Sequence, residues 1–115
     1  SRGASSLTAA VEAIESLQTA VRLKPGLFRA QHNLASALLQ AGQTEAAIVH
    51  YQAALRVDPQ SYEAKANLGL AYGRQGDLAR SEQEFVAALQ LKPDYAPAVN
   101  GLAMVRTAQQ QTGRP

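Results

Sequence analysis

A regular internal repeat constrains this chain more than any other feature of its sequence. Pro25, Pro59 and Pro93 are evenly spaced, and each ends a similar phrase: TAVRLKP, AALRVDP and AALQLKP. When residues 28–61 are placed on residues 62–95, nine positions carry the same residue type. These pairs are Ala30/Ala64, Asn33/Asn67, Leu34/Leu68, Ala37/Ala71, Gly42/Gly76, Ala53/Ala87, Ala54/Ala88, Leu55/Leu89 and Pro59/Pro93. The period is 34 residues, the spacing between these prolines. A repeat of this length indicates small supersecondary units that stack on one another.

Each period has the pattern of two helices. Residues 28–41 place leucine and alanine at helical spacing, and Gly42 ends the run as a helix C-terminus requires. A second run, 44–57, repeats this spacing and ends before Pro59. In the next period, Asp77 stands where a second helix needs an N-cap acceptor. The short turns between the runs predict antiparallel helix hairpins and an all-α chain.

The period resembles the tetratricopeptide repeat, whose pattern is large, Leu, small and Tyr, followed by small, aromatic, small and Pro. The matching positions are Gln31, Leu34, Ala35, Leu38, Ala47, Tyr51, Ala54 and Pro59 in the first repeat, and Lys65, Leu68, Gly69, Tyr72, Ser81, Phe85, Ala88 and Pro93 in the second. Gln31 and Lys65 replace a common aromatic residue and Ser81 replaces the usual Ala, so we expect looser packing there. The resemblance implies a right-handed α-solenoid of antiparallel helix hairpins, with about six helices.

The ends of the chain fall into the same period. Ala13, Leu17, Ala20 and Pro25 match the second helix of a repeat, whereas Val99, Leu102 and Ala103 match a first helix. We therefore expect a disordered or non-native leader at 1–5, the second helix of a partial repeat at 6–25, whole repeats at 28–61 and 62–95, a first or capping helix at 96–110, and a disordered tail at 111–115. Such a chain has the appearance of a section cut from a longer solenoid.

The composition excludes several classes of protein. Cysteine is absent from the 115 residues, which rules out a disulfide-stapled miniprotein and any cysteine-ligated metal site or thiol enzyme. The formal net charge is only +2, which does not predict nucleic-acid binding. No apolar run is long enough for membrane insertion. Eight Arg against three Lys indicate a GC-rich bacterial source. The compartment stays open between cytoplasm and periplasm, with the cytoplasm slightly favoured.

The sequence holds no pattern typical of an enzyme, a metal site or a cofactor site. It has no glycine-rich phosphate loop, no GxSxG and no HExxH. His32 and His50 fall on different predicted helices, so we interpret them as surface residues rather than as a zinc or catalytic pair. Glu82 and Glu84 point apart on one helix, which indicates a solvated face. We therefore expect neither enzymatic activity nor a cofactor.

The resemblance implies a binding surface instead. In this family the first helix of each repeat lines a concave groove that holds a segment of another protein. Transferring that arrangement by position places ten residues on the groove: Arg29, His32, Asn33, Ser36, Glu63, Asn67, Leu70, Arg74, Asn100 and Met104. Leu39, Leu70 and Met104 would be apolar contact points if they are exposed; the alternative is that they are buried between helices.

Two of these residues, Asn33 and Asn67, occupy the same place in successive repeats. A side-chain amide can both donate to and accept from a peptide backbone. This placement resembles the asparagine ladder in the repeat domain of protein O-linked N-acetylglucosamine transferases, which is thought to grip the substrate backbone. The alternative is that asparagine is merely tolerated at this position. The ladder stops in the last predicted helix, where Gly101 takes the equivalent place.

A second subclass of the family clamps the C-terminal carboxylate of heat-shock chaperones with two lysines, two asparagines and an arginine. The matching positions here are His32, Ser36, Asn67, Pro97 and Gly101, of which only Asn67 agrees. We therefore exclude the carboxylate clamp.

These observations predict a protein-interaction module, or scaffold, that binds a protein or peptide segment. Two alternatives from other classes remain. The chain could be the substrate-presenting part of a larger enzyme such as a glycosyltransferase, which a downstream catalytic domain would reveal. It could also form a homo-oligomer through the solenoid ends, which sedimentation at increasing concentration would reveal.

Overall fold

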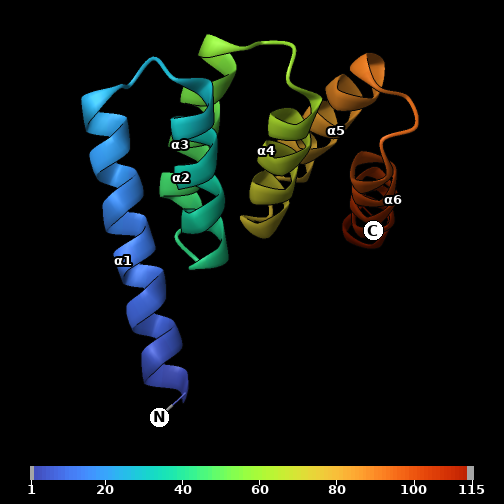
Figure 1. The fold of residues 1–115 in the computed structure, drawn as a ribbon. Coiled ribbons are helices and arrows are strands. Elements are labelled where there is room, and N and C mark those ends of the chain that lie inside the picture. Colours follow the sequence, from blue (N-terminus) through green and yellow to red (C-terminus); the bar gives the residue numbers. More distant parts are fainter. Residues whose placement is uncertain (1, 114–115) are drawn as a thin grey trace. The chain divides into compact units, whose positions relative to one another are not determined.

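The computed structural model describes residues 2–113, and the side chains of residues 6–113. Within this part of the chain, six helices follow one another through short turns (Figure 1). They are α1 (Arg2–Leu23), α2 (Phe28–Gln40), α3 (Thr44–Val57), α4 (Tyr62–Arg74), α5 (Leu78–Leu91) and α6 (Ala96–Thr112). The chain divides into two compact units, which we call the N-terminal unit (Ser1–Asp58) and the C-terminal unit (Pro59–Pro115).

In the N-terminal unit, α2 and α3 form a helix hairpin, and α1 packs against α2. Gly42 joins the two helices of the hairpin with a φ of +82°, a left-handed conformation that glycine adopts without steric cost. The amide of Gln43 then donates to the carbonyl of Leu38 at 2.9 Å, which closes the end of α2. The most deeply buried residues of this unit, each at most 1% exposed, are Leu34, Ala35, Ala47, Tyr51 and Ala54.

The C-terminal unit repeats the hairpin with α4 and α5 and adds α6, which packs against both. Gly76 takes the place of Gly42, with a φ of +81°. The predicted N-cap is confirmed: the Asp77 carboxylate accepts a hydrogen bond from the Arg80 amide at 3.1 Å. A buried cluster holds the three helices together and consists of Ala66, Phe85, Ala88, Ala98 and Val105.

Two glycines allow α4 and α6 to approach the same aromatic ring. A Cβ built on Gly69 in α4 would lie 3.2 Å from the ring of Phe85, and one built on Gly101 in α6 would overlap that ring. Phe85 is 3% exposed, so its ring cannot turn away into solvent. The absence of side chains at Gly69 and Gly101 therefore sets how closely both helices approach α5.

Two departures from the repeat pattern do not loosen the packing, contrary to our expectation. Gln31 is buried; its amide donates to the carbonyl of Pro25 at 2.9 Å, and its carbonyl oxygen pairs with His50 Nδ1 at 2.8 Å. Ser81 is fully buried and donates to the carbonyl of Gly69 at 2.6 Å. In both cases hydrogen bonds satisfy the polar side chain, so its burial is not penalised.

The helix bounds differ from the predicted ones at both ends. The structure begins α1 at Arg2 and ends α6 at Thr112, so helix covers part of the segments expected to be disordered at 1–5 and 111–115. Ser1, Arg114 and Pro115 lie outside the described residues. Among residues 2–113, no helix is both long and apolar enough to cross a membrane.

Replacing Gly101 by alanine is expected to destabilise the fold. Alanine at a helix interior is normally favoured over glycine by about 1 kcal/mol. Here the added methyl overlaps the Phe85 ring, and overpacking costs about 1–3 kcal/mol. We expect a lower free energy of unfolding for Gly101→Ala in urea denaturation. Combining it with Phe85→Leu should cost less than the two single changes added together. A Gly101→Ala variant more stable than wild type would contradict this packing.

Candidate functional site

One face of α4 carries four of the predicted binding residues. Glu63, Asn67, Leu70 and Arg74 follow one another at steps of four, three and four residues, which places them on one side of a helix. Glu63, Leu70 and Arg74 are exposed, and Asn67 is half-buried. Leu70 is 42% exposed, so this face includes an apolar side chain in contact with solvent.

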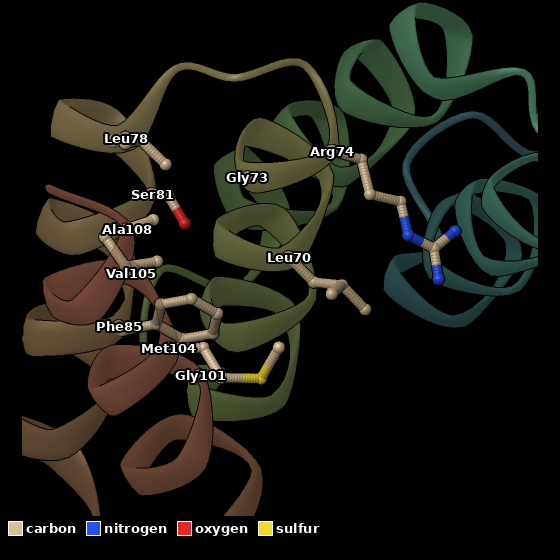
Figure 2. Close-up of a pocket in the computed structure, with 10 residues that line it drawn as sticks. All are labelled: Leu70, Gly73, Arg74, Leu78, Ser81, Phe85, Gly101, Met104, Val105 and Ala108. Carbon is tan, nitrogen blue, oxygen red and sulfur yellow. The ribbon is translucent and has the colours of Figure 1, made fainter. Parts of the chain in front are cut away.

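Helix α6 carries the other predicted binding residues of the C-terminal unit. Asn100 and Met104 lie one turn apart and are both exposed, Met104 to 74%. Met104 follows Leu70 by one full period, so the two hold the same position in consecutive repeats. Both line one cavity of about 360 Å³ in the C-terminal unit (Figure 2). Of the two alternatives left open for these three residues, burial between helices holds for Leu39, which is 5% exposed, and exposure holds for Leu70 and Met104.

The cavity is almost entirely apolar. Figure 2 shows residues from three helices around it: Leu70, Gly73 and Arg74 from α4, Leu78, Ser81 and Phe85 from α5, and Gly101, Met104, Val105 and Ala108 from α6. The Ser81 hydroxyl is already used as a donor to the carbonyl of Gly69. Arg74 is the charged residue among the ten. A cavity of this size and lining suits apolar groups of a ligand.

The two repeats differ at the positions that make this cavity. Gly73 lines the cavity where the first repeat has Leu39, and Ser81 lines it where the first repeat has Ala47. A Cβ on Gly73 would meet the Ser81 hydroxyl oxygen at 3.2 Å, and otherwise faces open space apart from the Ser81 Cβ. Sequence reasoning did not identify the cavity, although the exchange of leucine for glycine between aligned repeats was a signal for it.

In the N-terminal unit, some of the binding residues predicted on α2 are exposed and others are buried or half-buried. Arg29 and Asn33 are exposed. His32 is 7% exposed, stacks on Phe28 with ring centroids 5.4 Å apart, and meets the edge of Tyr51. Ser36 is half-buried and shares a hydrogen bond of 2.9 Å with the Tyr51 hydroxyl. His32 is therefore a packing residue and not an accessible one, which corrects both the groove and the surface assignment made for it.

His50 also departs from the surface interpretation, because it is half-buried and bound to Gln31. Since the Gln31 amide nitrogen donates to Pro25, its oxygen must accept from His50, which fixes the proton of the neutral ring on Nδ1. Burial lowers the pKa of His50 below its ordinary value of 6.5. Within residues 2–113, no group of three or more His, Cys, Asp or Glu side chains could hold a metal ion.

The acidic residues of α5 are not simply solvated, contrary to the prediction. Glu82 forms an ion pair with Arg106 of α6 at 3.3 Å, and Gln109 donates to its other oxygen at 3.4 Å. Glu84 is half-buried, and burial raises its pKa despite the opposing charge of Lys65. Arg106 is exposed, and its ion pair with Glu82 connects α6 to α5.

Glu63 lies at the start of α4 near a pair of tyrosines. The rings of Tyr62 and Tyr95 meet edge to face, with centroids 4.9 Å apart, and Lys92 lies over the Tyr62 ring. Burial raises the pKa of the Tyr95 hydroxyl, and the charges of Glu63 and Tyr62 raise it further. This end of the α4 face is therefore polar and aromatic, whereas the cavity end is apolar.

Comparison with known families decides what these helix hairpins are. A model described as "TPR repeat" matches residues 35–76, and one described as "Tetratricopeptide repeat" matches residues 62–95. Together they cover more than half of the chain. The chain belongs to the tetratricopeptide-repeat family. The fold class predicted from the sequence, an all-α tetratricopeptide-repeat solenoid, is thereby confirmed.

Solved tetratricopeptide-repeat structures agree with this. A crystal structure of MamA aligns with a TM-score of 0.84 at 25% identity, over 88% of this chain and 59% of that one. The present chain thus spans less than two thirds of that MamA chain. The Sgt2 TPR domain from Aspergillus fumigatus aligns with a TM-score of 0.86 at 22% identity, over 99% of this chain and 77% of that one.

A third solved structure contains a ligand. The second TPR domain of human RPAP3, in complex with the HSP70 peptide SGPTIEEVD, aligns with a TM-score of 0.81 at 25% identity, over 91% of this chain and 88% of that one. A search of curated proteins found no match to the sequence.

The half-buried His50 of the first tetratricopeptide repeat predicts that the stability of the fold depends on pH. Its pKa is lower in the folded than in the unfolded chain, so the unfolded chain binds the proton first as the pH falls. The contribution of His50 to stability is therefore full above pH 6.5 and is lost as the pH falls below it. We expect the free energy of unfolding to decrease from about pH 7 to about pH 5.5.

The matched control is His50→Gln, which can still donate to Gln31 but does not titrate. Its stability should change less than that of wild type over the same pH range, because the glutamine at position 50 carries no titrating proton. Equal pH slopes for the two proteins, measured by urea denaturation, would show that His50 is not responsible.

Proposed function

We propose that this chain is a protein-interaction module that binds a segment of a partner protein on its first-helix faces. In the C-terminal unit these faces are the Glu63–Arg74 side of α4 and the Asn100–Met104 side of α6. The observation that carries the proposal is the apolar cavity between them, with Leu70 and Met104 exposed at its rim. Exposed apolar side chains around a cavity are typical of surfaces that bind other molecules.

Relatives with the same fold support the proposal. The second TPR domain of human RPAP3 binds a peptide of HSP70, and it is 25% identical to this chain. Helical-repeat proteins generally hold their ligands on the surface presented by successive repeats. We extend this role to the present chain as a binder of a protein or peptide segment, with no part in it for nucleic acid, a metal or a catalytic residue.

The partner we propose is not a chaperone C-terminus bound through a carboxylate clamp. The positions that match the clamp hold His32, Ser36, Pro97 and Gly101 besides Asn67. His32 is buried and Ser36 is bonded to Tyr51, so neither offers a cation to a terminal carboxylate. The class of ligand is therefore set by other residues of this chain.

Asn33 and Asn67 are the residues we propose for contact with the partner backbone. Asn33 is exposed and Asn67 is half-buried on the α4 face beside Leu70. An amide that both donates and accepts can hold a peptide group regardless of its side chain. The placement is similar to the ladder of the O-linked N-acetylglucosamine transferases, and a bacterial origin fits the arginine-rich composition.

The test is a screen of randomised peptides displayed on phage, followed by titration calorimetry of the enriched peptides. Asn33→Ala/Asn67→Ala is expected to weaken their binding by about tenfold, because each lost hydrogen bond costs about 0.5–1.5 kcal/mol. The matched control is Gln83→Ala/Gln90→Ala, which removes two exposed amides from α5 and should leave the affinity unchanged.

No enrichment above a blank surface would contradict the function as a peptide binder. Enrichment with equal affinity for the asparagine double variant would remove Asn33 and Asn67 from the site and leave the function standing.

A further inference from the structure

We propose that the cavity of the C-terminal unit is a specificity pocket for one bulky aliphatic side chain of the partner, next to which the partner carries a glutamate or aspartate. The proposal rests on the function proposed above and names the ligand chemistry that this unit selects. It concerns residues within the C-terminal unit alone: the α4 and α6 rim, and the α5 residues behind it.

The size of the cavity sets the scale of the occupant. Its volume is about 360 Å³. An apolar cavity of about 150 Å³ is large enough for benzene. The pocket can therefore take a leucine, isoleucine or methionine side chain together with part of the chain that carries it. It is too small for a folded element such as a whole helix to enter.

The lining selects an apolar occupant over a polar one. Leu70, Met104 and Val105 present hydrocarbon or thioether groups, and Phe85 presents its ring. The Ser81 hydroxyl donates to Gly69 at 2.6 Å and keeps no proton for a ligand. A polar side chain entering the pocket would lose its water against a lining that is mostly apolar, which costs free energy. Met104 can adjust to different aliphatic shapes because its thioether chain is flexible.

The positive charge of Arg74, which lines the cavity, indicates what kind of partner residue lies next to the aliphatic side chain. Arg74 lies one turn after Leu70 on α4, is exposed, and is the charged residue among those that line the cavity. Arg106 of α6 does not line the cavity. A side-chain carboxylate beside the aliphatic residue would complement the positive charge of Arg74. We propose a side-chain carboxylate of the partner rather than its C-terminal carboxylate, because this chain lacks the residues of the carboxylate clamp.

We attribute the pocket to two exchanges between the repeats. The first repeat has Leu39 and Ala47 where the second has Gly73 and Ser81. Leu39 is 5% exposed and Ala47 is fully buried, so the leucine–alanine pair is well accommodated by this fold. Gly73→Leu/Ser81→Ala transfers that pair into the second repeat and should fill the pocket. It also replaces a glycine within a helix by a better helix former, so folding should not suffer.

The experiment uses the full chain and a short synthetic peptide with a central leucine followed by glutamate, the other positions being alanine and serine. Binding is followed by ¹H–¹⁵N NMR. We expect the amides of Gly73, Gly101 and Met104 to shift during titration. Replacing the peptide's leucine by alanine should weaken binding about tenfold, because the pocket then loses most of its apolar contact. Replacing its glutamate by glutamine should weaken binding by about twofold to fivefold at low salt.

The protein variants complete the test. The Gly73→Leu/Ser81→Ala variant is expected to bind the leucine peptide at least about tenfold more weakly than wild type. Its melting temperature should be no lower than that of wild type. Ser81→Ala alone keeps the pocket open and should still bind. Met104→Ala should weaken binding, whereas its matched control Val99→Ala, an exposed apolar residue of α6 outside the pocket, should not.

Three results would overturn the pocket assignment: equal binding by Gly73→Leu/Ser81→Ala and wild type, no preference for leucine over alanine, or no shift at the pocket amides. An equal affinity for the glutamine peptide would overturn the acidic part of the ligand. The best peptides from the display screen separate this proposal from the function itself. If they bind wild type and Gly73→Leu/Ser81→Ala equally well, the binding function holds and the pocket assignment fails; if no peptide binds wild type, both fail.

Discussion

The close approach of helices to one aromatic ring is the constraint on which the C-terminal unit depends. Phe85 is buried against Gly69 of α4 and Gly101 of α6, and neither position has room for a side chain without a shift of the ring. Interiors packed to this density transmit any added volume to the neighbouring helices. The small residues of the repeat pattern are thus structural requirements of the helix crossings.

Polar residues enter this packing where the repeat pattern has apolar ones, and each is satisfied. Ser81 replaces alanine and donates to the carbonyl of Gly69. Gln31 replaces an aromatic residue and joins Pro25, in the turn between α1 and α2, to His50 of α3. A buried hydrogen bond of this kind compensates the loss of water, so the departures cost little. They also give the two units different interiors on the same backbone plan.

The candidate binding surface also arises from residues that differ between the two repeats. The backbone plan recurs with every period, but Gly73 leaves open a space at the position where Leu39 is buried in the first repeat. The cavity therefore belongs to one repeat and not to the family pattern. This is how a repeat fold acquires selectivity: the regular spacing holds the helices, and exchanges at a few facing positions shape what they can bind.

The sequence by itself determined the period, the helix hairpins, the capping by Asp77 and Gly42, and membership of the family, because these depend on local spacing and on backbone preferences of single residues. It also indicated which faces of α2, α4 and α6 are candidates for binding. Only the tertiary structure decided that His32 and Leu39 are buried, that Ser36 is bonded to Tyr51, and that Leu70 and Met104 stand at the rim of a cavity. The physical reason is that burial and cavity shape depend on side chains brought together from different helices. Spacing along one helix specifies a face, but the residues opposite that face decide whether it is filled, satisfied or open.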